Sequence, residues 1–398
     1  MNKHTELLAP AGDLQRGKMA IDFGANAIYF GAKVYSLRSR ASNFDYPQLY
    51  EMINYAHEHK AKAYIVSNIV CHNHMLAGVK DFLIEVMKTA PDAFLCTDPY
   101  IIKMIKSNYP RANIHISTQQ SVTNSKAALF FARNGAKRIV TAREVSFNEI
   151  KEMIKNVNGQ IEIEMFVHGA VCISYSGRCM LSSNMCLRDA NNGGCAQSCR
   201  WVSELYLNNK SLSKTFSMSA KDMSLVGYLK DVVNSGLTSV KIEGRMKSEH
   251  YIATIVNDYR KILDALYNNE PVPKEYIEDI NKAANREVSF AWFNGKPTTN
   301  EMLYHEIPKR VNQIFAMLVK SKVNENTYEV ISKNYFTINN NFEILGRNLM
   351  HIEKVKLTKI INKDNLEISI VNTPMQELIV CLDKNINLES NDILRIVL

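Results

Sequence analysis

The sequence predicts an α/β fold, namely a TIM-type (β/α)8 barrel followed by a small C-terminal β-barrel-like domain. Two observations predict the barrel: eight short apolar, β-branched runs occur before residue 246, and helix-like segments alternate with them. A third observation predicts the second domain, because after residue 310 short alternating segments follow one another at the spacing of strands.

The eight runs account for the barrel in order. Repeated strand-then-helix units imply a parallel sheet covered by helices, and eight such units within about 250 residues match a TIM-type barrel in count and size. A doubly wound open sheet is the alternative, but no GxGxxG motif follows the first run. The runs are ELLAPA (6–11), AIYFGA (27–32), KAYIVS (62–67), AFLCTD (93–98), NIHIST (113–118), RIVTAR (138–143), IEIEMFVHG (161–169) and SVKIEGR (239–245).

The domain boundaries follow from changes in this pattern. We divide the chain into a barrel (1–270) with a cysteine-rich insert (172–199), a helical or irregular connector (271–310) and a small β domain (311–398). Pro271, Pro273 and Pro297 interrupt regular structure in the connector. The segments expected as strands of the last domain are NQIFAMLVKS (312–321), TYEVISK (327–333), FEILGRN (342–348), HIEKVKLTKI (351–360), LEISIVN (366–372) and ILRIVL (393–398).

Composition sets the class of protein. Hydrophobic residues make up 46% of the 398 residues and charged residues 22%, as in ordinary globular proteins. No run approaches the roughly 20 apolar residues that span a bilayer, and no signal peptide is recognisable, so we expect a cytoplasmic protein with reduced thiols. The net charge of +8 permits a polyanionic partner such as RNA without requiring one.

Five of the eight cysteines lie between Cys172 and Cys199. Four thiolates can hold either a tetrahedral zinc ion or an iron–sulfur cluster. Structural zinc usually takes ligands in short pairs, and only Cys195 and Cys199 have that spacing, so we favour a cluster over zinc, and either over free thiols. We expect the isolated cysteines 71, 96 and 381 to be ordinary buried thiols.

Several blocks of sequence resemble a known family. The run EMFVHGAVCISYSGRCMLS (164–182) matches the signature of the collagenase-like peptidase family of unknown catalytic type. Further blocks occur in the same order as in that family, and the chain is identified as a member. These blocks are ELLAPAGDL (6–14), YFGAKVYSLRSRASNF (29–44), HISTQQSVTN (115–124), RDANNGGCAQSCR (188–200), SAKDM (219–223) and KIEGRMKSEHYIA (241–253).

The resemblance implies RNA chemistry more than proteolysis. Members of the family bind an iron–sulfur cluster through four cysteines and hydroxylate without molecular oxygen. The branch with the CISYSGRC and KIEGRMKS blocks resembles enzymes that form 5-hydroxyuridine at the tRNA wobble position, with prephenate as the hydroxyl source. By this resemblance a 4Fe-4S cluster is held by Cys172, Cys179, Cys195 and Cys199, while Cys186 has no assigned role. Neither the electron donor nor the oligomeric state can be inferred.

Candidate site residues lie where predicted strands end, which is the functional face of such a barrel. Prephenate carries two carboxylates, which guanidinium groups bind in bidentate fashion, so arginines are candidates for that role. We expect Glu243 and His168 to move protons, and Lys241 to bind phosphate or substrate. The candidates for substrate binding are Arg38, Asn43, Asn68, His72, Gln119, Arg143 and Arg245. Taken singly, any of them could instead cap a helix or form a salt bridge.

Two other functions remain open. One is peptide hydrolysis. The sequence has neither the HExxH motif of metalloproteases nor a GxSxG elbow, but one thiolate with His168 could form a catalytic dyad. A segment with five thiols favours a cluster over a single nucleophile. The other alternative is an rRNA-modifying or RNA-binding protein in which a metal site only braces a loop.

Overall fold

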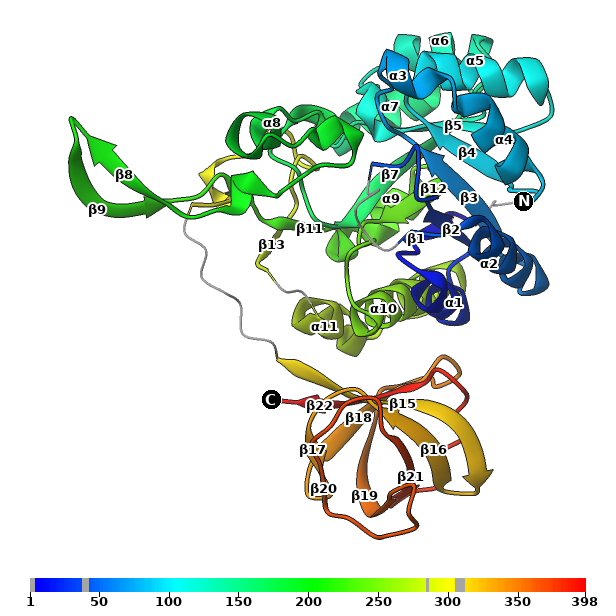
Figure 1. Ribbon diagram of the computed structural model, residues 1–398, viewed down its shortest axis with the longest axis vertical. Coiled ribbons are helices and arrows are strands. Elements are labelled where there is room, and N and C mark those ends of the chain that lie inside the picture. The colour runs from blue at the N-terminus through cyan, green and yellow to red at the C-terminus, as the bar shows by residue number, and fades with distance from the viewer. Residues whose placement is uncertain (1–3, 38–42, 284–285, 305–311) are drawn as a thin grey trace.

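The fold consists of a large α/β barrel and a smaller antiparallel β-barrel, which lies below it in Figure 1. The computed structural model describes residues 4–37, 43–283, 286–304 and 312–398. Both predicted barrels are therefore confirmed. None of the helices in these ranges is long and apolar enough to cross a membrane.

Eight parallel strands close the large barrel. Strand β12 pairs with β1 on one side and with β7 on the other, which joins the two ends of the sheet. Each of the eight predicted runs supplies one strand, and nearly all of their residues are buried, as expected for strands covered on both faces. In sheet order they are β1 (Glu6–Pro10), β2 (Ala27–Phe30), β3 (Lys62–Ser67), β4 (Ala93–Cys96), β5 (Ile114–Ile116), β6 (Arg138–Val140), β7 (Glu162–Gly169) and β12 (Ser239–Ile242).

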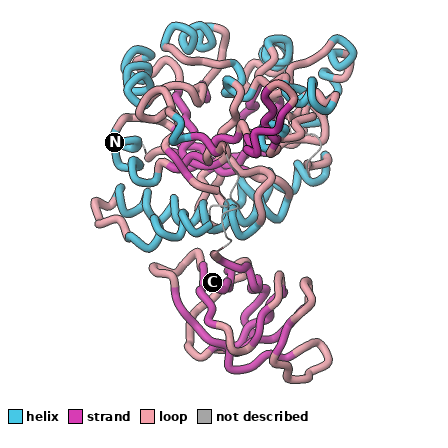
Figure 2. Tube along the Cα trace, turned by 90° about the vertical axis from the view of Figure 1, so that its left-hand side faces the viewer, coloured by secondary structure: helices cyan, strands magenta, loops and turns pink. Residues whose placement is uncertain are grey.

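Helices surround the strands on the outside, as Figure 2 shows. Asp, Asn or Ser residues cap the N-termini of several of them: Asp45 and Ser146 form complete capping boxes, and the Asp98 carboxylate accepts from the Tyr100 amide. The helices of this ring are α1 (Leu14–Asp22), α2 (Tyr46–Glu58), α3 (Asn73–Leu76), α4 (Val79–Met87), α5 (Pro99–Asn108), α6 (Ser125–Arg133), α7 (Phe147–Val157), α9 (Leu229–Asn234) and α10 (Glu249–Tyr267).

The cysteine segment is the first part of a longer insertion between β7 and α9. It contains the short helix α8 (Leu181–Cys186) and then a hairpin of β8 (Ser203–Leu207) and β9 (Lys210–Phe216), which projects from the barrel in Figure 1. After it, β10 (Ser219–Ala220) pairs with β14 (Met302–Leu303). Next, β11 (Asp222–Ser224) pairs with β7 and with β13 (Val288–Ser289), so two strands of the predicted connector return to the insertion.

The C-terminal barrel differs from the prediction in one strand. The segment 366–372 supplies only the two-residue strand β20 (Ile370–Val371), which pairs with β17 (Phe336–Thr337) outside the barrel. The sixth barrel strand is instead β21 (Glu377–Leu382), where five apolar residues in succession hide the alternation of buried and exposed positions. The closed order is β15 (Gln313–Asn324), β16 (Thr327–Ser332), β21, β19 (Glu353–Ile361), β18 (Asn341–Leu345) and β22 (Ile393–Val397).

A buried ionic contact joins the two domains. The Arg395 side chain is completely buried, and one guanidinium nitrogen lies 2.7 Å from Asp279 Oδ1 and 3.2 Å from Glu343 Oε2. Asp279 belongs to α11 (Lys274–Ala283), and it also accepts a hydrogen bond of 2.6 Å from Gln313 Nε2. The small barrel is thus joined to α11 by an ionic contact that is buried from water.

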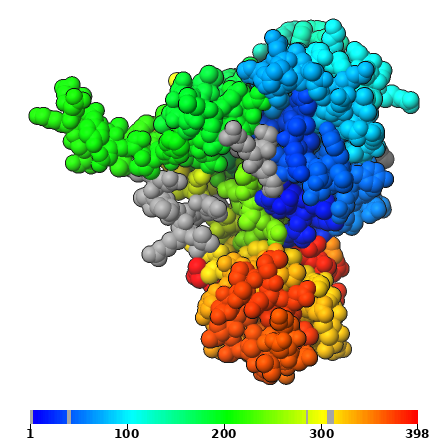
Figure 3. Space-filling view, in the orientation of Figure 1, coloured from blue at the N-terminus to red at the C-terminus, as the bar shows by residue number. Residues whose placement is uncertain are grey.

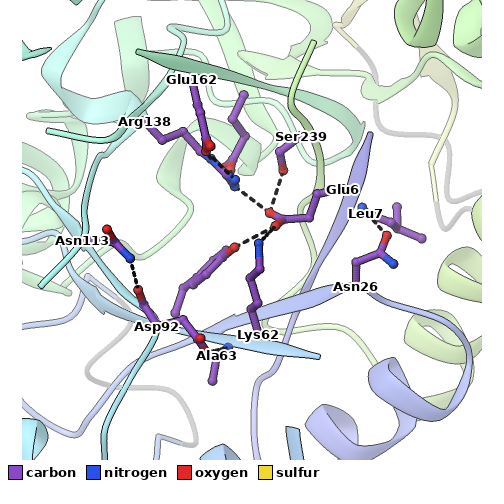
Figure 4. Close-up of polar contacts among 12 residues, drawn as sticks. Glu6, Leu7, Asn26, Lys62, Ala63, Asp92, Asn113, Arg138, Glu162 and Ser239 are labelled. Atoms are coloured by element: carbon purple, nitrogen blue, oxygen red, sulfur yellow. Dashed lines mark hydrogen bonds and ion pairs between the residues drawn. The ribbon is translucent and has the colours of Figure 1, made fainter. Parts of the chain in front are cut away.

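Charged residues also fill the floor of the large barrel, where TIM barrels usually hold branched apolar side chains. Arg138 Nη1 lies 2.6 Å from Glu6 Oε1 and 3.0 Å from Glu164 Oε2, and Lys241 Nζ lies 3.1 Å from Glu164 Oε1. Figure 4 shows Arg138, Ser239 and Lys62 converging on Glu6. Burial alone would raise the pKa of Glu6, but Arg138 and its neighbours lower it below its ordinary value.

Replacing Arg138 by Met should therefore destabilise the protein strongly, because two buried carboxylates lose their shared partner. We expect a loss of about 3 kcal/mol in the free energy of unfolding, measured by urea denaturation. Arg133→Met, at an exposed position of α6, is the control and should cost less than about 0.5 kcal/mol. Equal stability of the two variants would show that the ionic floor is not needed for the fold.

Candidate active site

A cavity of about 180 Å³ opens at the carboxyl ends of the barrel strands. Strands β2, β3, β4, β6, β7 and β12 form its base, and residues of the insertion form the opposite wall. This is the face on which TIM-type barrels carry their functional sites. The strand residues that line the cavity are Tyr29, Val66, Leu95, Val140, Phe166 and Lys241.

Four of the five clustered cysteines line this cavity, namely Cys172, Cys179, Cys195 and Cys199. Burial raises the pKa of the Cys172 and Cys199 thiols, and the other thiols of the group add to that rise, as expected for thiols close enough to interact. Cys186 is not among the lining residues: its Sγ lies 3.3 Å from Ser198 Oγ. The cavity thus separates Cys186 from the four cysteines that the family resemblance selects.

The four thiols line one cavity but are not placed to hold a single metal ion together. Within the described parts of the chain, no group of three or more His, Cys, Asp or Glu side chains is placed to hold one metal ion. Cys195 is exposed, whereas Cys179 is buried. The group therefore extends from the wall of the cavity to its rim.

Asn191 fixes the position of Cys179. Its side-chain oxygen accepts a hydrogen bond of 3.3 Å from the Cys179 amide, and its side-chain nitrogen donates one of 3.1 Å to the Cys179 carbonyl. The backbone carbonyl of Asn191 also accepts from the amide of Val70, in the loop after β3. The turn before Cys195 requires glycine at 194, because a Cβ there would lie 2.6 Å from the Asp189 carbonyl.

Another contact ties the insertion to the strand-end loop after β6. The Ser176 amide donates to Glu144 Oε1 at 2.7 Å, and the Ser176 hydroxyl lies 3.3 Å from Glu144 Oε2. Sequence reasoning identified neither Asn191 nor Ser176, because an Asn or Ser in a loop carries no signal of the backbone group that it will bind.

Arg245 is held rigidly at the cavity. Its two terminal nitrogens donate to Ser36 Oγ at 3.0 Å and to Asn43 Oδ1 at 2.5 Å, and only 5% of the residue is exposed. Asn43 does not line the cavity, so the structure places this predicted substrate ligand behind Arg245. Arg143 lines the cavity too, with its guanidinium carbon 4.2 Å from the centre of the Phe166 ring.

Lys241 and Glu243 complete the charged lining. Lys241 Nζ is bound to Glu164 and lies 4.3 Å from the centre of the Tyr29 ring. Burial lowers the pKa of Lys241, although the nearby Glu164 opposes that effect. Glu243 reaches the rim only because residue 169 is glycine: at its φ of +110° a Cβ would lie 2.4 Å from the Glu243 carbonyl.

The remaining predicted substrate ligands differ in position. Asn68 and Gln119 line the cavity; the Asn68 side-chain oxygen accepts from the Leu37 amide at 3.2 Å. His72 is exposed outside the cavity, with Nε2 3.4 Å from Asp189 Oδ2 of the insertion. Arg38 lies outside the described residues.

The position of His168 does not support its predicted role in proton transfer. Phe166 pairs with Lys241 and His168 pairs with Ile242, so β7 contains one extra residue relative to β12. Such a bulge exchanges the two faces of a strand. His168 is buried against Tyr251 and Tyr259 of α10, with ring centres 5.9 and 5.5 Å away, and does not line the cavity.

The fold and the site define a TIM-type barrel protein with a thiol-lined cavity at its mouth. The chain belongs to peptidase family U32: the family model matches residues 12–303, and the model of the family's C-terminal domain matches residues 312–395. The resemblance seen in the sequence is thereby confirmed.

The curated relatives include proteins named for tRNA hydroxylation and one named collagenase. The tRNA hydroxylation protein P1 of Bacillus subtilis is 38% identical over 400 residues, which cover 97% of this chain and 94% of that protein. The tRNA hydroxylation protein P of Helicobacter pylori (strain J99) is 36% identical over 305 residues, which cover 73% of this chain and 72% of that protein. A protein named collagenase from Porphyromonas gingivalis is 29% identical over 66% of each chain.

The burial of His168 predicts a loss of stability in acid. Burial lowers its pKa to about 3, whereas the unfolded chain retains the ordinary value near 6.5, so below pH 6.5 the unfolded state binds the additional proton. The free energy of unfolding should then fall by up to about 1.4 kcal/mol per pH unit between those values. The His168→Gln variant lacks this imidazole, so its free energy of unfolding should decrease less than that of the wild type between pH 7 and pH 5. His74→Gln, at an exposed position, should retain the wild-type decrease, and identical decreases in both variants would contradict this account.

Proposed function

We propose that this protein is an iron–sulfur-dependent enzyme that hydroxylates tRNA without molecular oxygen. The product that we infer is 5-hydroxyuridine at the wobble position, formed with prephenate as the hydroxyl source. The observation that carries the proposal is that the four clustered thiols share one cavity with Arg143, Lys241, Glu243 and Arg245. The names of the relatives from Bacillus and Helicobacter add support for tRNA as the substrate.

The donor set fits a 4Fe-4S cluster. Four cysteine thiolates are the usual ligands of such a cluster, and because each binds a different iron they do not have to meet at one ion. Cys172, Cys179, Cys195 and Cys199 would hold it, and Asn191 would keep Cys179 in place. When bound, the cluster would supply electron transfer, or would order the insertion.

The arginines provide recognition of a dicarboxylate. The Arg245 guanidinium is already oriented by Ser36 and Asn43, so little side-chain entropy is lost when it binds an anion. Arg143 presents a second guanidinium from the loop after β6, supported by the Phe166 ring. Two guanidinium groups on one cavity match the two carboxylates of prephenate.

Two further groups are candidates for moving protons. Lys241 lies on β12 at the base of the cavity, where burial lowers its pKa and Glu164 holds Nζ in place. It can bind an anionic group while protonated or accept a proton once neutral. Glu243, at the end of β12, can accept a proton from a nucleotide at the mouth of the cavity.

Peptide hydrolysis is the second candidate, because one relative is named collagenase. A cysteine nucleophile needs a base within hydrogen-bond reach. His168, the base considered from the sequence, packs against the tyrosines of α10, so this geometry favours hydroxylation over hydrolysis.

Iron content tests the ligand set. Anaerobically purified protein should contain about four irons and four sulfides per chain. Alanine at Cys172, Cys179, Cys195 or Cys199 should greatly reduce both, because each removes a ligand. Cys186→Ala is the matched control from the same segment and should retain both. A colourless wild-type protein with one bound zinc would overturn the proposed cofactor.

Nucleoside analysis tests the reaction. In cells that lack this gene, mass spectrometry of digested tRNA should show loss of 5-hydroxyuridine and its derivatives. Expression of the wild type or of Cys186→Ala should restore them, whereas Cys172→Ala and Arg245→Ala should not. Removal of prephenate synthesis should have the same effect as removal of the gene. Unchanged 5-hydroxyuridine in the deletion strain would refute tRNA hydroxylation.

A further inference from the structure

The hairpin of β8 and β9 is the most exposed element of the insertion. Every residue from 201 to 215 is exposed, and the two strands form a separate two-stranded sheet. Figure 3 shows it as a projection from the body of the molecule. An isolated hairpin is marginally stable in water, and this one keeps large apolar side chains in solvent. It therefore has the properties of a docking element.

The root of the hairpin lies at the cavity. It begins directly after Cys199, and where the chain returns, the Ser217 hydroxyl donates to the Cys199 carbonyl at 3.4 Å. Phe216 stacks on Tyr304, with ring centres 5.7 Å apart, which anchors the returning strand. A molecule bound along the hairpin would consequently lie beside the mouth of the cavity.

The side chains of the hairpin combine aromatic rings with positive charge. Trp201 is 48% exposed and Tyr206 is 61% exposed, while Lys210 and Lys214 are exposed on β9. Glu204 is the single acidic residue between 200 and 216, and it accepts the hydrogen bond of the Tyr206 hydroxyl. Proteins that bind unpaired nucleotides use this combination, because bases stack on the rings and phosphates pair with the cations.

The distribution of charge favours an anionic partner over a second copy of the chain. Residues 173–216 contain five Lys or Arg and two Asp or Glu, whereas residues 312–398 contain ten of each. The net charge of +8 thus resides outside the small barrel, and the insertion carries a large part of it. Two copies that met through this surface would bring like charges together.

A nucleotide that enters the cavity requires RNA contacts outside the cavity, which the hairpin could provide. A base must leave its stack to enter a cavity of about 180 Å³ inside the barrel mouth. The contacts that compensate for unstacking have to lie outside the cavity, next to its rim. We propose that the hairpin from residue 201 to residue 216 is an RNA-binding arm that holds the tRNA beside the cavity. The identity of the RNA rests on the proposed function.

Charge reversal and ring removal test this arm in the full-length protein. Binding of unmodified, in vitro transcribed tRNA would be measured by fluorescence anisotropy over a range of salt concentrations. Lys210→Glu with Lys214→Glu should weaken binding about tenfold or more and reduce its salt dependence, because phosphate contacts are lost. Trp201→Ala with Tyr206→Ala should weaken binding about tenfold through lost stacking, with the salt dependence unchanged.

A matched pair serves as the control. Lys354→Glu with Lys356→Glu reverses the same number of exposed charges on β19 of the small barrel and should leave tRNA affinity within about twofold of the wild type. The iron content of all variants should equal that of the wild type, which shows that the cysteine segment remains folded.

Two results would overturn the inference. One is wild-type affinity in both hairpin variants while the wild-type enzyme binds and hydroxylates tRNA, which would leave the proposed function intact. The other is a pair of results: Leu205→Ala with Leu207→Ala keeps its affinity for tRNA but loses a co-purifying protein subunit, and the lysine changes have no effect on tRNA binding. That result would make the hairpin a protein-docking element. If the wild-type protein does not bind tRNA at all, the proposed function fails first.

Discussion

The buried pairing of Arg138 with Glu6 and Glu164 is the interaction on which the arrangement of the barrel depends. These residues belong to β6, β1 and β7, and Lys241 of β12 continues the chain of charges from Glu164 toward the cavity. Charges taken out of water tolerate little displacement, because each depends on its partner at a fixed distance. The floor thus sets the positions of the strands that meet where the sheet closes, and it places the Lys241 ammonium directly beneath the site.

Above this floor, the insertion is positioned by contacts with several different strands. Asn191 bonds to Cys179 and to the loop after β3, while Ser176 bonds to Glu144 in the loop after β6. The segment that brings the thiols therefore spans the barrel mouth instead of extending from one strand. This explains how residues far apart in the chain, such as Cys172 and Arg245, come to line one cavity.

The eight strands could be predicted because strands covered on both faces are continuous apolar runs, which need no periodicity to be recognised. The grouping of the cysteines was also evident from their spacing. His168 shows where such reasoning ends: alternation from Phe166 would place it in the cavity, but one extra residue in β7 turns it toward α10. Asn43 shows another limit, because its family block marks it as functional without showing that it supports Arg245 and does not reach the cavity.

The same extra residue in β7 has a consequence for how this barrel could acquire other chemistry. Because the side chains of a strand alternate, the bulge at 166–168 determines which face His168 takes, and one residue inserted opposite it in β12, between Lys241 and Ile242, would restore regular alternation and turn His168 toward the cavity. An imidazole would then enter a cavity that already contains cysteine thiols, which is the pairing that a thiol nucleophile requires. Insertion of a single residue in β12, with no substitution at all, would thus place an imidazole beside thiols on this scaffold.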